Sequence, residues 1–131
     1  MTNQNFEIQL AQQLAATLMM PIFLVDTEGS LIFYNEPAEI ILGRRFHETG
    51  EMAASVWSRI FIPTDEFDQP LFPETLPLMI ALNERHPAHG QFWIRGIDNI
   101  RRQIEVVAFP LTTKNDRHLG AIAIFWEIQE K

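Results

Sequence analysis

The chain has 131 residues, of which 47% are hydrophobic, and this size and composition fit one compact domain with a substantial core. Seventeen acidic residues against ten Lys and Arg give a net charge of −7, so a phosphate backbone would be repelled and nucleic-acid binding is not expected. Cysteine is absent, which excludes disulfides, thiolate metal ligands, a cysteine nucleophile and a cysteinyl-flavin adduct.

The longest apolar run, residues 18–25, is too short to span a bilayer, and the segment before it lacks the basic residues of a signal peptide. A chain without cysteine is also compatible with a reducing compartment. We therefore expect a cytoplasmic protein that does not insert directly into a membrane.

Residues 1–20 are predicted to form an N-terminal amphipathic segment, with a helix over residues 3–18. Apolar residues recur there every four positions and form a narrow stripe, which consists of Phe6, Leu10, Leu14 and Leu18. Two compatible roles are open for this stripe. It packs on its own domain, or it forms the seam of a homodimer.

Two strands, PIFLVD and LIFYN, are predicted next, joined by the turn TEGS. In the first strand both alternate faces are apolar, with Ile22 and Leu24 on one and Phe23 and Val25 on the other. A strand of this kind is buried on both faces and needs cover on both sides. The N-terminal helix is expected to supply the second cover.

A short helix is predicted over residues 36–42. Asn35 is a good N-cap, Pro37 is tolerated in the first turn, and Gly43 can close the last turn. The sequence that follows, up to residue 70, is less regular, and short helical turns are expected around ETGEMAASVWSRIF.

A longer helix is predicted after the segment PLFPE. Thr75 is expected to cap it, Pro77 to lie in its first turn, and Pro87 to end it near Arg85 or His86. Its buried face is predicted to carry Leu78, Met79 and Leu82.

Three further strands are predicted in QFWIRGI, RRQIEVVAFPL and HLGAIAIFWEI. Asn99 lies in the turn between the first two, where it can accept a positive φ. The order of elements predicts an α+β domain with an antiparallel sheet and helices on one face.

Four segments in this order resemble a PAS domain over residues 21–128. They are the hairpin and short helix PIFLVDTEGSLIFYNEPAEIILGRRF, the segment PLFPETLPLMIALNER, the strand that ends in AFPL, and GAIAIFWEIQ. The second is similar to the P-x-x-x-L-P-L-x-x-A-L segment of a bacterial PAS subgroup. The sequence departs from the family at Asp98-Asn99, where Asp-Gly is usual, and at Glu127-Ile128-Gln129, where Asp-Ile-Thr is usual.

The resemblance implies a five-stranded antiparallel sheet in the order 2-1-5-4-3, with helices cupped over one face. It implies a sensory module of two-component type and not an enzyme. Such a module binds an apolar small molecule in the cup or mediates homodimerisation, and it regulates an attached histidine kinase, diguanylate cyclase or phosphatase. Residues 129–131 would begin a truncated signalling linker, which Glu127 would contact. The alternative is a ligand-free dimerisation and scaffolding module.

His86 and His89 form an H-x-x-H pair, but Pro87 between them prevents one helical face from presenting both, and no third ligand is evident. No metal site is therefore expected. PAS relatives that bind haem use a histidine of the central helix, and residues 78–84 contain none, which argues against haem. The identity of any cofactor stays unknown, with a non-covalent flavin still open.

Aromatic residues are spread over the elements that would wall the cup, namely Phe33, Phe46, Trp57, Phe61, Phe92, Trp93 and Trp126. They fill the core completely, or they surround an apolar pocket. The residues expected to line such a pocket are Phe33, Trp57, Ile60, Leu78, Met79, Leu82, Ile104, Val106, Ile122 and Ile124. An error of one residue in strand facing would exchange the whole set of sheet residues in this list.

Overall fold

The computed structural model of the chain describes residues 10, 13, 14, 17, 19–95, 99–113 and 115–128. Most of the predicted N-terminal helix, with Phe6 and Leu18, lies outside the described residues, as do Asp98 and the predicted linker over 129–131. Leu10 and Leu14 are described, and their exposed fractions are 56% and 61%.

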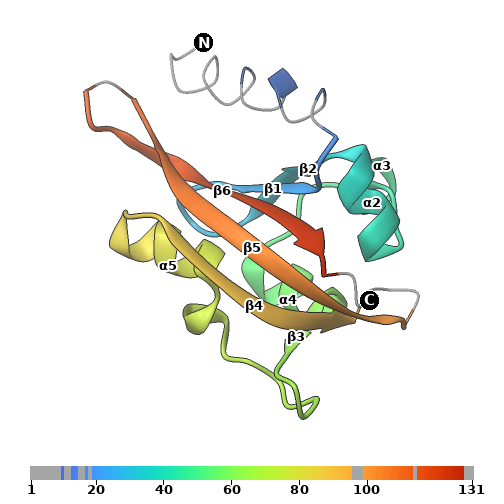
Figure 1. Cartoon of the computed structure of the whole chain (residues 1–131). Coiled ribbons are helices and arrows are strands. Elements are labelled where there is room, and N and C mark those ends of the chain that lie inside the picture. The colour runs from blue at the N-terminus through green and yellow to red at the C-terminus, as the bar shows by residue number, and fades with distance from the viewer. Residues whose placement is uncertain are drawn as a thin grey trace.

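The core of the fold is one antiparallel sheet of six strands in the order β2-β1-β6-β5-β4-β3 (Figure 1). The strands are β1 (Ile22–Val25), β2 (Leu31–Tyr34), β3 (Ile62–Thr64), β4 (Ala88–Arg95), β5 (Arg101–Thr112) and β6 (His118–Glu127). The five predicted strands and their order are confirmed. The predicted number of strands is wrong, because β3 pairs with β4 as a sixth. Its three residues include Pro63, and so short a segment with a proline gives no strand signal.

In the described part of the chain, four α-helices and one 3₁₀ turn connect the strands. They are α2 (Glu36–Leu42), α3 (Phe46–Thr49), α4 (Ala54–Ile60), η1 (Pro73–Thr75) and α5 (Pro77–Glu84). Helix α2 has the predicted bounds. The side chain of Asn35 accepts a hydrogen bond from the backbone N–H of Ala38, and Gly43 closes the helix with a φ of 84°. No helix of the described residues is both long and apolar enough to cross a membrane.

The predicted cap of α5 is wrong. Leu76 occupies the N-cap position and makes no side-chain cap bond there. The hydroxyl of Thr75 donates instead to the carbonyl of Phe72, the residue just before η1, at an O···O distance of 2.7 Å. The 3₁₀ turn therefore uses the hydroxyl that the sequence pattern assigned to α5.

The sheet carries apolar residues on both faces, and the two sets alternate along β1. Phe23 and Val25 belong to the main core under the helices, whereas Ile22 and Leu24 belong to a second cluster on the opposite face. We call the first face the cup face and the second the outer face. The prediction that β1 is buried on both faces is confirmed, since all four side chains are buried.

Candidate functional site

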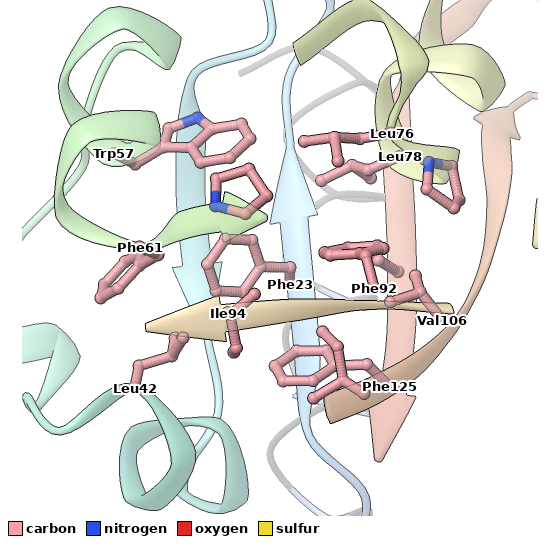
Figure 2. Close-up of a pocket in the computed structure, with 14 residues that line it drawn as sticks. Phe23, Leu42, Trp57, Phe61, Leu76, Leu78, Phe92, Ile94, Val106 and Phe125 are labelled. Carbon is pink, nitrogen blue, oxygen red and sulfur yellow. The ribbon is translucent and has the colours of Figure 1, made fainter. Parts of the chain in front are cut away.

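The cup face holds a cavity of about 60 Å³ between the sheet and the helices (Figure 2). Side chains from β1, α2, α4, β3, α5, β4, β5 and β6 converge on it, together with Leu76 just before α5. The lining residues are Phe23, Leu42, Trp57, Phe61, Pro63, Leu76, Pro77, Leu78, Phe92, Ile94, Ile104, Val106, Ala123 and Phe125. Both predicted alternatives are therefore partly met, because large side chains fill most of the cup and leave a small apolar space.

Phe23 stands at the centre of an aromatic cluster beside this cavity. Its ring lies 5.9 Å from the Trp57 ring, 5.8 Å from Phe61 and 5.9 Å from Phe125, all edge to face. Tyr34 stacks on it at 5.6 Å. Edge-to-face pairs at such distances stabilise a core by about 0.5–1.5 kcal/mol each beyond the area that they bury. The cluster gives the cavity a wall with fixed geometry.

Tyr34 carries a polar atom of this aromatic cluster away from the cavity. Its hydroxyl donates to the carbonyl of Arg44 at 2.9 Å and lies 3.3 Å from the hydroxyl of Thr49. Burial is the main cause that raises the pKa of Tyr34. The phenol is therefore neutral at physiological pH and serves to anchor the segment after α2.

Seven of the ten residues predicted to line a pocket lie on the cup side. Trp57, Leu78, Ile104 and Val106 line the cavity itself. Ile60, Met79 and Leu82 belong to or pack against the same core cluster without lining the cavity.

The other three predicted residues, Phe33, Ile122 and Ile124, lie on the outer face and are a correction to the prediction. On β6 the cup face carries Ala121, Ala123 and Phe125 instead. Both sets of alternate residues in this strand are apolar, so hydrophobicity does not distinguish the faces, and size alone favours the larger isoleucines for the core side. The pairing of Phe23 with Ala123 shows why small residues are needed inward, since each alanine of β6 makes room for a bulky neighbour.

The predicted aromatic wall divides between the two faces. Phe61 and Phe92 line the cavity, and Phe46 packs against the cup cluster. Trp93 and Trp126 alternate with cup-facing residues on β4 and β6 and so point to the other side of the sheet. Sequence reasoning missed Phe23, which lines the cavity and contacts four other rings, although the double-sided burial of its strand was the available signal.

His86 and His89 lie outside the cavity, at the corner between α5 and β4. Both are exposed, and no group of three or more His, Cys, Asp or Glu side chains suited to a metal occurs in the described part of the chain. His86 contacts the carbonyl of Pro87 at 2.9 Å and the carboxylate of Glu84 at 3.0 Å. The hydrogen bond to Pro87, followed by that to Glu84, raises the pKa of His86. These contacts fix the corner between α5 and β4.

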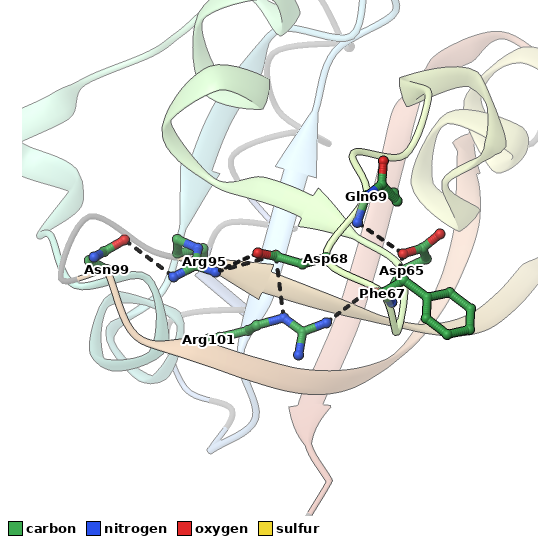
Figure 3. Close-up of polar contacts among 7 residues, drawn as sticks. All are labelled: Asp65, Phe67, Asp68, Gln69, Arg95, Asn99 and Arg101. Atoms are coloured by element: carbon green, nitrogen blue, oxygen red, sulfur yellow. Dashed lines mark hydrogen bonds and ion pairs between the residues drawn. The ribbon is translucent and has the colours of Figure 1, made fainter.

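An ion-pair cluster ties the turn after β3 to the end of the sheet (Figure 3). The carboxylate of Asp68 accepts from the guanidinium of Arg95 at 3.1 Å and lies 3.5 Å from that of Arg101. Arg101 also donates to the carbonyl of Asp65 at 2.7 Å, and its guanidinium lies 4.1 Å from the centre of the Trp93 ring. The cluster fastens the turn that follows β3, the strand whose Pro63 lines the cavity.

Glu127, predicted to contact a signalling linker, lies at the end of β6. Its carboxylate is 3.8 Å from the guanidinium of Arg102, which also donates to the carbonyl of Ile41 at the end of α2. The linker lies outside the described residues, so its contact with Glu127 stays a prediction. The observed pair connects the last strand to the helix that borders the cavity at Leu42.

Comparison with known proteins places this arrangement in one fold. No family model and no curated protein matches the sequence. Among solved structures, the PAS domain of Bordetella pertussis BvgS is similar with a TM-score of 0.64 and 14% identity, over 95% of this chain and 88% of that one. The PAS domain of nitrogen regulation protein NR(II) from Vibrio parahaemolyticus is similar with 0.64 and 14%, over 91% and 98%.

A third similar structure is the LOV protein of Rhodobacter sphaeroides, with a TM-score of 0.71 and 12% identity, over 98% of this chain and 70% of that one. These identities are too low to transfer a ligand or a partner, but the common arrangement covers nearly the whole chain. The fold of this chain is therefore that of a PAS domain.

Proposed function

We propose that the chain is a sensory PAS module, which converts a change in the cup into a change at the outer face of its sheet and so regulates an attached effector domain. The fold supports this proposal, because several solved structures with it are PAS domains, one of them from a two-component sensor histidine kinase. The effector would be a histidine kinase, a diguanylate cyclase or a phosphatase.

One observation carries the proposal. In β1 and β6 neighbouring residues belong to different apolar clusters, so a single layer of backbone separates the cavity from the outer face. Ala123 lines the cavity, and Ile122 and Ile124 on either side of it belong to the outer cluster. Because packed side chains on both faces share this backbone, a shift of the strand on the cup side must also repack the outer side.

Ala123→Val tests this coupling. The two added methyl groups enter the cavity and are expected to displace β6, which changes the amide resonances of Ile22, Leu24 and Ile122 on the outer side. If the outer face binds a second copy or an effector, the dissociation constant should change by about fivefold or more, the lower range of coupling between two sites. NMR spectra and sedimentation velocity measure the two effects.

Ala53→Val is the matched control, because Ala53 is exposed just before α4 and the same two methyl groups there meet solvent. It should leave both the outer-face resonances and the association unchanged. An outer face that stays unperturbed in a folded Ala123→Val protein would contradict the proposed signalling role.

A ligand-free dimerisation module is the second candidate function. The cavity of about 60 Å³ is small, which favours a filled core. Leu10 and Leu14 are more than half exposed, and the outer cluster includes partly buried side chains such as Phe109 and Ile124. Apolar surface of this kind is typical of protein contacts.

Replacement of Leu10 and Leu14 with glutamate should convert a dimer to monomers if this stripe is the seam. Removal of two buried leucines and introduction of two charges per subunit should raise the dissociation constant by at least about a hundredfold. Sedimentation equilibrium measures the change, and Gln13→Glu, on the same segment and exposed, serves as the charge control. A dimer that persists in the double variant would place the contact elsewhere, with the outer face as the next surface to test.

A further inference from the structure

The cavity offers no polar group to a ligand. Among its lining side chains only Trp57 carries a nitrogen or oxygen, and the indole N–H donates to the carbonyl of Gly29 at 2.9 Å. The backbone N–H of Phe61 donates to the carbonyl of Trp57 at 2.9 Å, and the carbonyl of Pro63 accepts from Leu71 at 3.0 Å. Pro63 itself and Pro77 have no backbone N–H to offer.

The backbone polar groups of Leu76, in a second segment of the wall, are also hydrogen-bonded within the protein. The backbone N–H of Leu76 donates to the carbonyl of Pro73 at 3.1 Å, and the carbonyl of Leu76 accepts from Ile80 at 2.9 Å. A ligand with a hydroxyl, amide or carboxylate would have to bury that group without a partner, at a cost of about 1–3 kcal/mol or more. The chemistry of the wall therefore selects for molecules that have no polar group.

The volume sets a second limit. Pockets for drug-sized ligands and cofactors have about 300–1,000 Å³, several times the 60 Å³ found here. An apolar protein cavity of about 150 Å³ stays dry and binds benzene or xenon. By proportion, this cavity accommodates one xenon atom or a hydrocarbon of about two or three carbon atoms.

Phe92 lies at the entrance of the cavity. Of the fourteen described residues that line the cavity, thirteen are buried and Phe92 alone is half-buried. Pro77, which also lines the cavity, packs against the same face of β4, since a Cβ placed on Gly90, two residues before Phe92, would lie 3.4 Å from the Pro77 ring. Phe92 thus stands between the cavity and solvent, and Figure 2 shows its ring below Leu76 and Leu78.

We propose that this cavity binds a small molecule without any polar group, of the size of xenon or a two- to three-carbon hydrocarbon, which enters past the ring of Phe92. This inference rests on the proposed sensory function in one respect only: it names the chemical class of the signal that the cup would detect. Flavin and haem are larger than this cavity, and organic acids carry polar groups for which its wall offers no anchor.

Xenon is the first probe, applied under pressure to the wild-type protein with isotope-labelled methyl groups. The methyl resonances of Leu78, Ile104 and Val106 should shift and saturate with xenon pressure. The methyl groups of Ile40, whose side chain is 72% exposed, should show only a small, non-saturating change. Cavity methyl groups that do not shift, or shift no more than those of Ile40, would overturn the proposal.

Phe92→Ala provides the second test, with benzene as the probe. Loss of the ring enlarges the cavity and its mouth, so benzene at about ten times its Kd should raise the Tm of the variant by about 5 °C and leave the wild-type Tm unchanged. Phe67→Ala is the control, because Phe67 is 74% exposed on the turn after β3. Phenol should bind Phe92→Ala at least about tenfold more weakly than benzene does; equal binding of the two would contradict an apolar-only site.

Failure of this inference and failure of the proposed function are distinguishable. In one outcome xenon binds in the cup, but the resonances of Ile22 and Leu24 do not shift, and Ala123→Val also leaves the outer face unchanged. This result supports the ligand class and contradicts signalling through the sheet. Xenon that leaves the cup unshifted, while Ala123→Val repacks the outer face, contradicts the ligand class and supports the signalling module.

Discussion

Replacement of Gly120 with alanine should lower the free energy of unfolding by about 4 kcal/mol or more, the largest effect expected from a single methyl group in this protein. A Cβ at this position would lie 2.0 Å from the carbonyl oxygen of Val25 and 3.0 Å from the Cα of Asp26, both backbone atoms that cannot rotate away. Gly120 also has a φ of 143°, which side-chain-bearing residues rarely adopt. Strand β6 must therefore move away from β1, which disturbs both faces of the sheet.

Gly50→Ala separates the two causes. Gly50 also has a positive φ, of 65°, but nothing lies within 4 Å of an added Cβ. This variant should lose only about 1–3 kcal/mol, the cost of a backbone conformation (φ 65°, ψ −166°) that residues other than glycine rarely adopt. Urea denaturation of both variants gives the comparison through the midpoint and the m-value. Equal losses at the two positions would mean that β6 accommodates the methyl group, and the close approach of the two strands would then not limit stability.

The elements that could be predicted from the sequence are those with short-range signals. Helix α2 has its bounds set by Asn35 before it and Gly43 after it, and both residues act within one turn of the helix. Asn99 likewise adopts the positive φ, 63°, expected of its turn. In these cases the chemistry of one residue and its immediate neighbours decides the local structure, so no information from distant parts of the chain is needed.

The elements that could not be predicted depend on contacts across the fold. Strand β3 forms because β4 offers a free edge to it and the Asp68 carboxylate fastens the following turn to Arg95 and Arg101. The facing of β6 depends on the bulk of Phe23 opposite Ala123. Thr75 bonds to Phe72 in a 3₁₀ turn whose formation no local pattern distinguished from a helix cap. Pairing, volume and competition between two nearby turns are each decided by the tertiary structure.

The candidate site shows the same division. Two residues of the cavity wall, Leu78 of α5 and Trp57 of α4, could be predicted because the periodicity of a helix places one face inward. Ile104 and Val106 of β5 were also predictable. The residues between and after them are the polar Glu105 and Val107, which is 37% exposed, so the pattern shows which face of the strand is buried. On β6 both faces are apolar, and the direction is lost. The size of the cavity was beyond the sequence altogether, since it depends on how large side chains from separate elements fit together.

The second large effect is expected at Asn35, which is 1% exposed and joins three parts of the chain. Its side-chain oxygen accepts from the backbone N–H of Ile22 at 2.9 Å and of Ala38 at 3.3 Å, and its amide donates to the carbonyl of Met20 at 2.8 Å. Asn35→Ala removes the helix cap and leaves the buried backbone N–H of Ile22 in β1 without this acceptor. The free energy of unfolding should fall by about 3 kcal/mol.

Two further variants decide whether this loss comes from the named bonds. Asn83→Ala changes an exposed asparagine of α5 and should alter stability by no more than about 0.5 kcal/mol. Asn35→Asp keeps the two acceptor bonds but places a carboxylate against the carbonyl of Met20, so at neutral pH its stability should lie between those of wild type and Asn35→Ala. Denaturant titrations at constant pH measure all three. If Asn35→Asp were as stable as wild type, the amide donor to Met20 would contribute nothing, and α2 would depend on Asn35 only as its cap.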